Sequence, residues 1–252
     1  EGYQVRSLLS IGDKALEFHQ KNAILNGYSL HYFMIIFWYG RGCCKIQSGS
    51  VDSTVLIDPY HPQVRRRLSR TTPDVLTLTS TRANPDWSQS AARDISNDTF
   101  IIQYPGEYES HGVFITALRA HKKALGQKDV PQSTLISSFG IDEMSLVHLG
   151  DLDRTLTEAE LDALGRVDIL LLPVGGNGSL NAATAVEVLK QVEPRVIIPV
   201  MYNTGPDDKE FSDEKEFMKE YGIKEVETLD KLKIVKKDLP AEESRVVILT
   251  PA

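Results

Sequence analysis

The stretch MIIFWYGRGCCKIQSGSVDSTVLIDP, residues 34–59, decides the fold class of this chain. It contains three short apolar or β-branched runs, at residues 35–39, 43–47 and 53–57, separated by turns that contain glycine. Runs of this length between glycine turns are typical of β-strands. We therefore predict that the folded part opens with an antiparallel meander.

Further strands are expected through the first two thirds of the chain. They fall at residues 74–79, 99–103, 112–118, 133–138 and 144–149, with a turn at Tyr104-Pro105-Gly106. Each is a short run rich in apolar and β-branched residues, as strands are. This part of the chain is therefore expected to be mostly sheet.

Helices are predicted in the last third. Thr157 followed by Glu160 has the spacing of a capping box, and Asn181 can cap a helix with one apolar stripe. That second helix lies between apolar runs at 167–174 and 195–200, which predicts two parallel strands joined by a right-handed crossover. A helix at 212–221, ended by Gly222, and strands at 232–236 and 245–250 complete one α/β domain.

The first 33 residues differ from the rest. They show no sustained apolar period and lack the basic and apolar regions of a signal peptide. We interpret residues 1–33 as an N-terminal appendage and residues 34–252 as the domain. Because Met34 begins the strand pattern, we hypothesise that it is the biological start, and peptides from residues 11–28 in the native protein would contradict this.

Composition restricts the partners and the compartment. The chain has 28 Lys and Arg against 35 Asp and Glu, a formal charge of −7, which argues against tight nucleic-acid or anionic-lipid binding. Its apolar runs are far shorter than the ~20 residues of a membrane-spanning helix. The two cysteines, Cys43 and Cys44, cannot build a disulfide framework or a cysteine zinc site. We expect a cytoplasmic protein.

Four segments together resemble the metallo-β-lactamase superfamily, especially its small bacterial branch similar to ascorbate-6-phosphate lactonase. They are residues 34–59, DVLTLTSTRANP (74–85), PGEYESHGVFI (105–115) and HLGD (148–151), followed by DILLLPVGG and PRVIIPVMY. The resemblance covers nearly all of residues 34–252. It implies a four-layer αββα sandwich and metal-assisted hydrolysis, in which bound zinc lowers the pKa of a water molecule.

The same resemblance implies that the metal-ligand set is degenerate. The family's His-x-His, Asp-His and last-strand His positions fall on Ser80, Arg82, Asn84, Pro85 and Met201. These residues are weak zinc ligands, lack a donor or, for arginine, repel a cation. Of the family's ligands, Asp151 and His121 remain, and two ligands do not make a catalytic zinc site.

Without a metal, Asp151 needs a positive or hydrogen-bonding partner. Arg82 is the first candidate, and Arg41, which replaces the histidine of the family's Gly-His-Ser-Cys segment, is the second. Two plainer alternatives stay open. Arg82 can instead point to solvent, and His121 can be a surface residue of the run His121-Lys122-Lys123.

Three function hypotheses follow. The first is a non-catalytic binding or scaffold protein without a metal cofactor, whose partner is a second copy, a small molecule or another protein. The second is a metal-dependent hydrolase of a phosphorylated lactone, phosphodiester or amide, with zinc or another divalent metal held by Asp151 and His121. The third, nucleic-acid handling, rests on one local basic patch at residues 65–70 and is disfavoured by the net charge.

Overall fold

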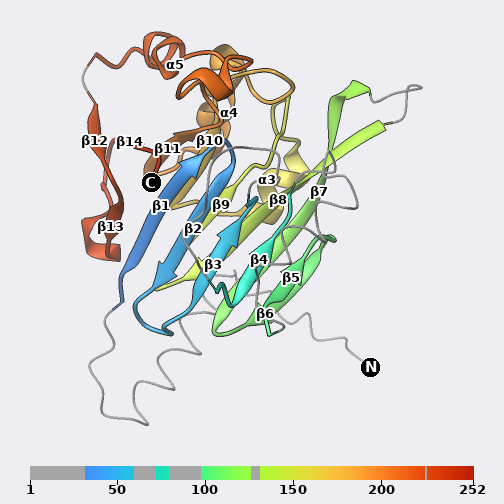
Figure 1. Ribbon diagram of the computed structural model, residues 1–252, viewed down its shortest axis with the longest axis vertical. Coiled ribbons are helices and arrows are strands. Elements are labelled where there is room, and N and C mark those ends of the chain that lie inside the picture. The colour runs from blue at the N-terminus through green and yellow to red at the C-terminus, as the bar shows by residue number, and fades with distance from the viewer. Residues whose placement is uncertain (1–31, 60–71, 80–97, 126–130, 225) are drawn as a thin grey trace, which may run out of the picture.

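The computed structural model describes residues 32–59, 72–79, 98–125, 131–224 and 226–252. Within these residues two β-sheets lie face to face, and three helices lie beside the second sheet (Figure 1). The sheet-rich α/β sandwich expected from the sequence is confirmed. Of the predicted appendage, the structure describes residues 32 and 33, and the Gly49 amide donates to the Phe33 carbonyl at 2.8 Å.

The first sheet has six strands. In spatial order they are β13 (Leu232–Ile234), β1 (Met34–Gly40), β2 (Cys43–Ser48), β3 (Thr54–Ile57), β4 (Val75–Thr77) and β5 (Phe100–Ile102). The pairings of β1 with β2 and of β2 with β3 are antiparallel, so the predicted opening meander is confirmed. The later pairings, β3 with β4 and β4 with β5, are parallel.

The second sheet has eight strands. In spatial order they are β12 (Glu227–Leu229), β14 (Arg245–Leu249), β11 (Val196–Val200), β10 (Ile169–Pro173), β9 (Met144–His148), β8 (Pro131–Ile141), β7 (Val113–Leu125) and β6 (Gly106–Ser110). The sequence did not predict β6 or β12, because their exposed glutamates interrupt any apolar run. Strands β7 and β8 are longer than predicted and form an extended hairpin (Figure 1).

The helices follow the predicted caps. Helix α3 (Glu158–Leu164) has the Thr157 capping box, and α4 (Ala182–Val192) is capped by Asn181. Helix α5 (Glu214–Tyr221) begins two residues later than predicted because Asp213 is its N-cap, and it ends at Gly222 as predicted. Strands β10 and β11 are parallel and flank α4 in sequence, so the crossover unit is confirmed.

The main core fills the space between the sheets. A second cluster lies on the other face of the six-stranded sheet, where Cys43 packs, whereas Cys44 belongs to the main core. The two cysteines therefore face opposite sides, as strand alternation requires. Helices α3, α4 and α5 supply the layer on the eight-stranded sheet, and the described residues contain no helix for the expected fourth layer. No described helix has the length and apolarity that crossing a bilayer would need.

Candidate functional site

Polar side chains gather where the two sheets meet at their carboxyl ends. We call Asp58, Thr79, Lys122, His148 and Asp151 the carboxyl-end cluster. Asp58 directly follows β3, Thr79 follows β4, and His148 ends β9. In open α/β sheets this edge is where ligands and catalytic groups are placed. The carboxyl-end cluster is therefore the candidate functional site.

A buried ion pair lies at the centre of the cluster. The Nζ of Lys122 lies 2.7 Å from Oδ2 of Asp151 and donates to the Gly178 carbonyl at 2.6 Å. The side chains of Lys122 and Asp151 are 1% and 7% exposed. An ammonium removed from water needs such partners, because an unpaired buried charge is strongly destabilising.

Strand alternation explains why Lys122 enters the cluster. On β7 the side chains of Ala120 and Lys122 are buried, whereas those of His121 and Lys123 are exposed. Successive residues of a strand face opposite sides, so His121 points away from Lys122. The two ligands that the sequence analysis retained, Asp151 and His121, are therefore not brought together, and the surface interpretation of His121 fits its position.

The proposed pairing of Arg41 with Asp151 is wrong. Its Nε lies 3.0 Å from Oδ1 of Asp208, and a terminal nitrogen lies 2.7 Å from Oε1 of Glu210. Arg41 stands in the turn between β1 and β2, and the fully buried Asp208 offers it a carboxylate there. Arg41 thus ties this turn to the loop between β11 and α5. The pairing of Arg82 with Asp151 stays a prediction.

The remaining predicted positions are placed as follows. Met201 directly follows β11, is half-buried against the main core and donates its amide to the Arg41 carbonyl at 3.0 Å. Residues Ser80, Arg82, Asn84 and Pro85 lie outside the described residues. Among the residues that are described, no three His, Cys, Asp or Glu side chains form a group that could hold a metal ion.

Asp58 is a member that the sequence analysis did not single out. The Thr79 amide donates to its Oδ1 at 2.7 Å, and the Thr79 hydroxyl donates to its Oδ2. Burial raises the pKa of Asp58 from its ordinary value to about 7, and the charge of Asp151 adds to the rise, although the Thr79 hydrogen bonds oppose it. Asp58 therefore titrates near neutral pH, and its position directly after β3 was the signal available in the sequence.

His148 is fully buried, and both of its ring nitrogens take part in hydrogen bonds with backbone groups. Its Nδ1 accepts from the Gly150 amide at 3.0 Å, so its Nε2 carries the proton and donates to the Gly42 carbonyl at 3.1 Å. Burial lowers the pKa of His148 to about 4. The neutral imidazole thus joins the turn between β1 and β2 to the loop that holds Asp151.

Gly150 makes the close approach of these segments possible. Its φ is +62°, and a Cβ there would lie 2.1 Å from Oγ1 of Thr134. The same Thr134 hydroxyl accepts from the Asp151 amide and donates to the Thr79 carbonyl. These hydrogen bonds fix the position of the segment from His148 to Asp151 between the two sheets, where Asp151 contacts Lys122.

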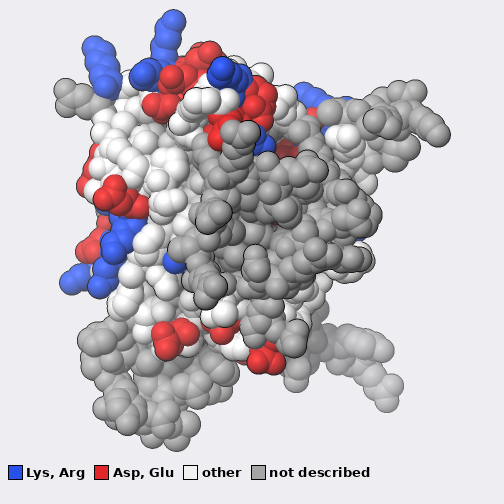
Figure 2. Space-filling model, viewed as in Figure 1, with Lys and Arg blue, Asp and Glu red and all other residues white. Residues whose placement is uncertain are grey.

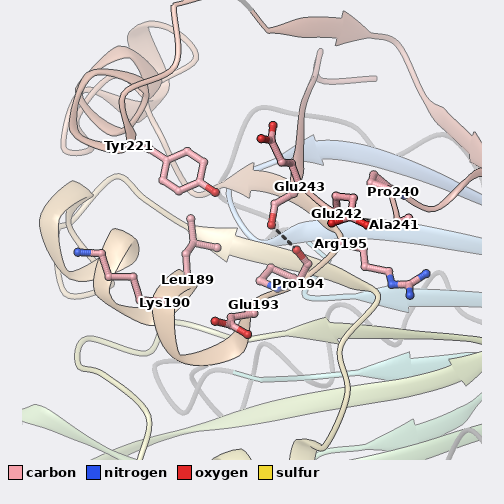
Figure 3. Close-up of a pocket in the computed structure, with 11 residues that line it drawn as sticks. Leu189, Lys190, Glu193, Pro194, Arg195, Tyr221, Pro240, Ala241, Glu242 and Glu243 are labelled. Atoms are coloured by element: carbon pink, nitrogen blue, oxygen red, sulfur yellow. Dashed lines mark hydrogen bonds between the residues drawn. The ribbon is translucent and has the colours of Figure 1, made fainter.

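A cavity of about 460 Å³ lies elsewhere, at the opposite end of the parallel strands. It is bounded by the end of α4, the residues before β11, Tyr221 and residues 240–244. Figure 3 shows Lys190 and Arg195 extending in different directions, with glutamates between them. The polar groups of the lining therefore do not converge on one point. In a specific ligand site they do converge.

A two-sheet α/β sandwich with a polar cluster at its carboxyl ends is the architecture of the metallo-β-lactamase fold. The family described as the beta-lactamase superfamily domain matches residues 35–201, more than half of the chain. The chain belongs to this family.

Individual relatives agree with this assignment. The chain is 26% identical over 208 residues to a UPF0173 metal-dependent hydrolase of Natranaerobius thermophilus, covering 71% of this chain and 89% of that one. Its fold is similar to that of a proposed Zn-dependent hydrolase of the metallo-beta-lactamase superfamily from Thermotoga maritima. That match has a TM-score of 0.68 at 25% identity and covers 86% of this chain and 98% of the other. A novel metallo hydrolase of Ignicoccus hospitalis shares the fold, with a TM-score of 0.58 at 18% identity over 87% and 96% of the two chains.

Proposed function

We propose that this chain is a metallo-β-lactamase-fold protein that works without a catalytic metal, as a binding or scaffold protein. The observation that carries the proposal is the buried contact between the Lys122 ammonium and Asp151. Asp151 matches the carboxylate that the superfamily resemblance assigns to the metal site. A covalently attached positive charge therefore neutralises the carboxylate that a divalent cation would otherwise use.

The donor set fits this proposal better than it fits a metal centre. A cation at Asp151 would lie beside the ammonium of Lys122, whose Nζ is 2.7 Å from Oδ2, and like charges in a buried site repel. The exposed His121 lies on the other face of β7. Catalytic zinc needs about three protein ligands, and the described residues bring no such set together.

The sequence supports the same conclusion at further positions of the resemblance. The five positions where the resemblance expects ligands carry Ser80, Arg82, Asn84, Pro85 and Met201. Their replacement together removes imidazole and carboxylate donors and adds one guanidinium, which changes the site from cation-binding to cation-free. Lys122 then supplies the charge that keeps Asp151 satisfied.

The competing function is a metal-dependent hydrolase with an atypical site, and the similarity to metal-dependent and Zn-dependent hydrolases favours it. Hydrolysis assays separate the two functions. The purified chain is incubated with bis(p-nitrophenyl) phosphate, with a phosphorylated lactone and with an amide, each with added Zn²⁺ or Mn²⁺. We expect the wild-type chain and the Asp151→Asn variant to hydrolyse each substrate at the same rate. Metal-stimulated hydrolysis that Asp151→Asn abolishes would overturn the proposal.

A restoration series tests the role of Lys122. The substitutions Ser80→His, Arg82→His, Asn84→Asp, Pro85→His and Met201→His are made together, with and without Lys122→Ala. We expect stoichiometric zinc only when Lys122 is also replaced, because the ammonium occupies the carboxylate that the metal needs. Equal zinc binding by both versions would mean that Lys122 does not take the place of a cation.

The described part of the surface that Figure 2 shows gives no support to nucleic-acid binding, and the basic patch at residues 65–70 lies outside the described residues. On the described part of one face, Lys and Arg lie next to Asp and Glu around α5 (Figure 2). A nucleic-acid groove needs basic side chains gathered along one surface. The net charge of −7 argues in the same direction.

A further inference from the structure

The exposed large apolar side chains of the described residues lie in one place. They are Phe100, Ile101 and Tyr104, which are 39%, 41% and 65% exposed. All three fall within five consecutive residues, on β5 and in the turn that follows it. Single exposed apolar residues are common, but a gathered set marks an interaction surface. We call these residues, with Tyr108, the edge patch.

The edge patch lies where both sheets end. Among the described residues, β5 is the last strand of the six-stranded sheet and β6 is the last strand of the eight-stranded sheet. Figure 1 shows the two strands at the same side of the sandwich. Neighbouring residues of a strand face opposite sides, so exposure of both Phe100 and Ile101 leaves both faces of β5 open to solvent.

Contacts within the edge patch hold it in a defined shape. The rings of Phe100 and Tyr108 meet edge to face at 5.9 Å between their centroids. The Tyr108 hydroxyl donates to the Tyr104 carbonyl at 3.0 Å. A rigid aromatic surface loses little side-chain entropy when a partner docks on it.

The charge beside the edge patch indicates what binds there. On β6, Glu107 and Glu109 are exposed and alternate with Tyr108, so the two carboxylates share one face of the strand. Neither carboxylate takes part in an ion pair with a described residue. On the neighbouring strand β7, Glu107 lies opposite Thr116 and Glu109 lies opposite Phe114. A second copy docked on the same strand would place like charges together, whereas a basic partner would offset them.

We propose that the edge of β6 that pairs with no described strand binds an extended polypeptide segment in which aliphatic residues alternate with Lys or Arg. The segment adds as a further strand, the mode known as β-augmentation. Its basic side chains lie on the face of Glu107 and Glu109, and its aliphatic side chains lie on the face of Tyr108 and Phe100. This inference stands apart from the proposed function, because the edge patch is far in sequence from Asp151 and involves no residue of the carboxyl-end cluster.

A synthetic peptide tests the proposal with the full chain. The probe is fluorescent Lys-Val-Lys-Val-Lys-Val-Lys-Val, compared by anisotropy with Glu-Val-Glu-Val-Glu-Val-Glu-Val and with the Lys-Val peptide N-methylated at alternate residues. We expect binding of the unmodified Lys-Val peptide alone. N-methylation removes backbone donors, so undiminished binding of the methylated peptide would overturn strand addition.

Variants locate the site. We expect Tyr104→Ser to weaken binding of the Lys-Val peptide by about tenfold. The double substitution of Glu107→Gln with Glu109→Gln should weaken it by a similar factor. The matched control is Glu216→Gln with Glu220→Gln on α5, which removes two exposed charges elsewhere and should leave the affinity unchanged. Circular dichroism and thermal unfolding confirm that each variant is folded. Equal loss in the control and the β6 pair would overturn the proposal.

Sedimentation tests the alternative occupant of the edge patch, a second copy of this chain. If the wild-type chain forms a dimer that Tyr104→Ser dissociates, the edge patch is a contact between two copies, and the proposal of a basic partner fails. We expect the same sedimentation coefficient for the wild type and for Tyr104→Ser.

Discussion

The ammonium nitrogen of Lys122 lies 2.7 Å from Oδ2 of Asp151, and both side chains are buried between the carboxyl ends of the two sheets. Asp151 reaches this position because the segment from His148 to Asp151 is fixed by hydrogen bonds to Gly42 and Thr134. Lys122 reaches it because strand alternation turns it inward on β7. A lysine and an aspartate from different segments thus form one buried ion pair.

The first prediction concerns the energy of this ion pair. Lys122→Met leaves a buried carboxylate without its ammonium, and Asp151→Asn leaves a buried ammonium without its carboxylate. Each variant should lower the free energy of unfolding by about 3–5 kcal/mol, because removing one partner of a buried ion pair is costly. The measurement is urea unfolding at neutral pH.

The double variant should lose less than the sum of the two single variants, since it carries neither charge, and the coupling should reach about 2–3 kcal/mol. Lys215→Met is the control, because its ion pair with Asp213 is exposed and should change stability by less than about 1 kcal/mol. Additive losses in the double variant would show that Lys122 and Asp151 are not coupled.

The second prediction concerns Asp58, whose raised pKa makes its folded form retain a proton that the unfolded chain releases. Its stabilising contribution is present at acid pH and is lost as the pH rises from about 4 through about 7. Asp58→Asn mimics the protonated carboxyl and does not titrate. The stability of this variant relative to the wild type should therefore increase over that pH range and stay constant above it. Urea unfolding at a series of pH values checks this, and a pH-independent difference would contradict the raised pKa.

The third prediction concerns His148, whose pKa is lowered. The folded protein keeps this imidazole neutral, so its contribution is present above about pH 6.5 and is lost as the pH falls through about 4. His148→Asn keeps an acceptor for the Gly150 amide but does not titrate. The variant should be destabilised at neutral pH, and its deficit should shrink by about 3 kcal/mol on acidification to pH 4. A deficit that grows on acidification would mean that His148 is charged in the folded state.

The sequence predicted the framework of the fold well. The meander at residues 34–59, the caps at Thr157 and Asn181, and the crossover between β10 and β11 depend on local patterns and are confirmed. Strand β6 was missed because only Tyr108 of its five residues packs against the core. Its alternating glutamates gave a polar segment instead of an apolar run.

The partners of the site were harder to predict because they depend on three-dimensional contacts. The resemblance points to His121, whereas strand alternation with the buried Ala120 indicates that Lys122 is the inward residue. Arg41 was expected near Asp151, but the buried Asp208, which is 167 residues away in sequence, binds it instead. No local pattern contains a pairing of that range.

The metal content of the protein tests the central claim most directly. The wild-type chain and Asp151→Asn are purified without chelator, supplied with Zn²⁺, Mn²⁺ and Fe²⁺ in turn, and freed of loosely bound ions before elemental analysis by mass spectrometry. If Lys122 replaces the cation, both proteins should contain the same trace of metal, well below one ion per chain. One equivalent of metal in the wild type that disappears in Asp151→Asn would contradict the account.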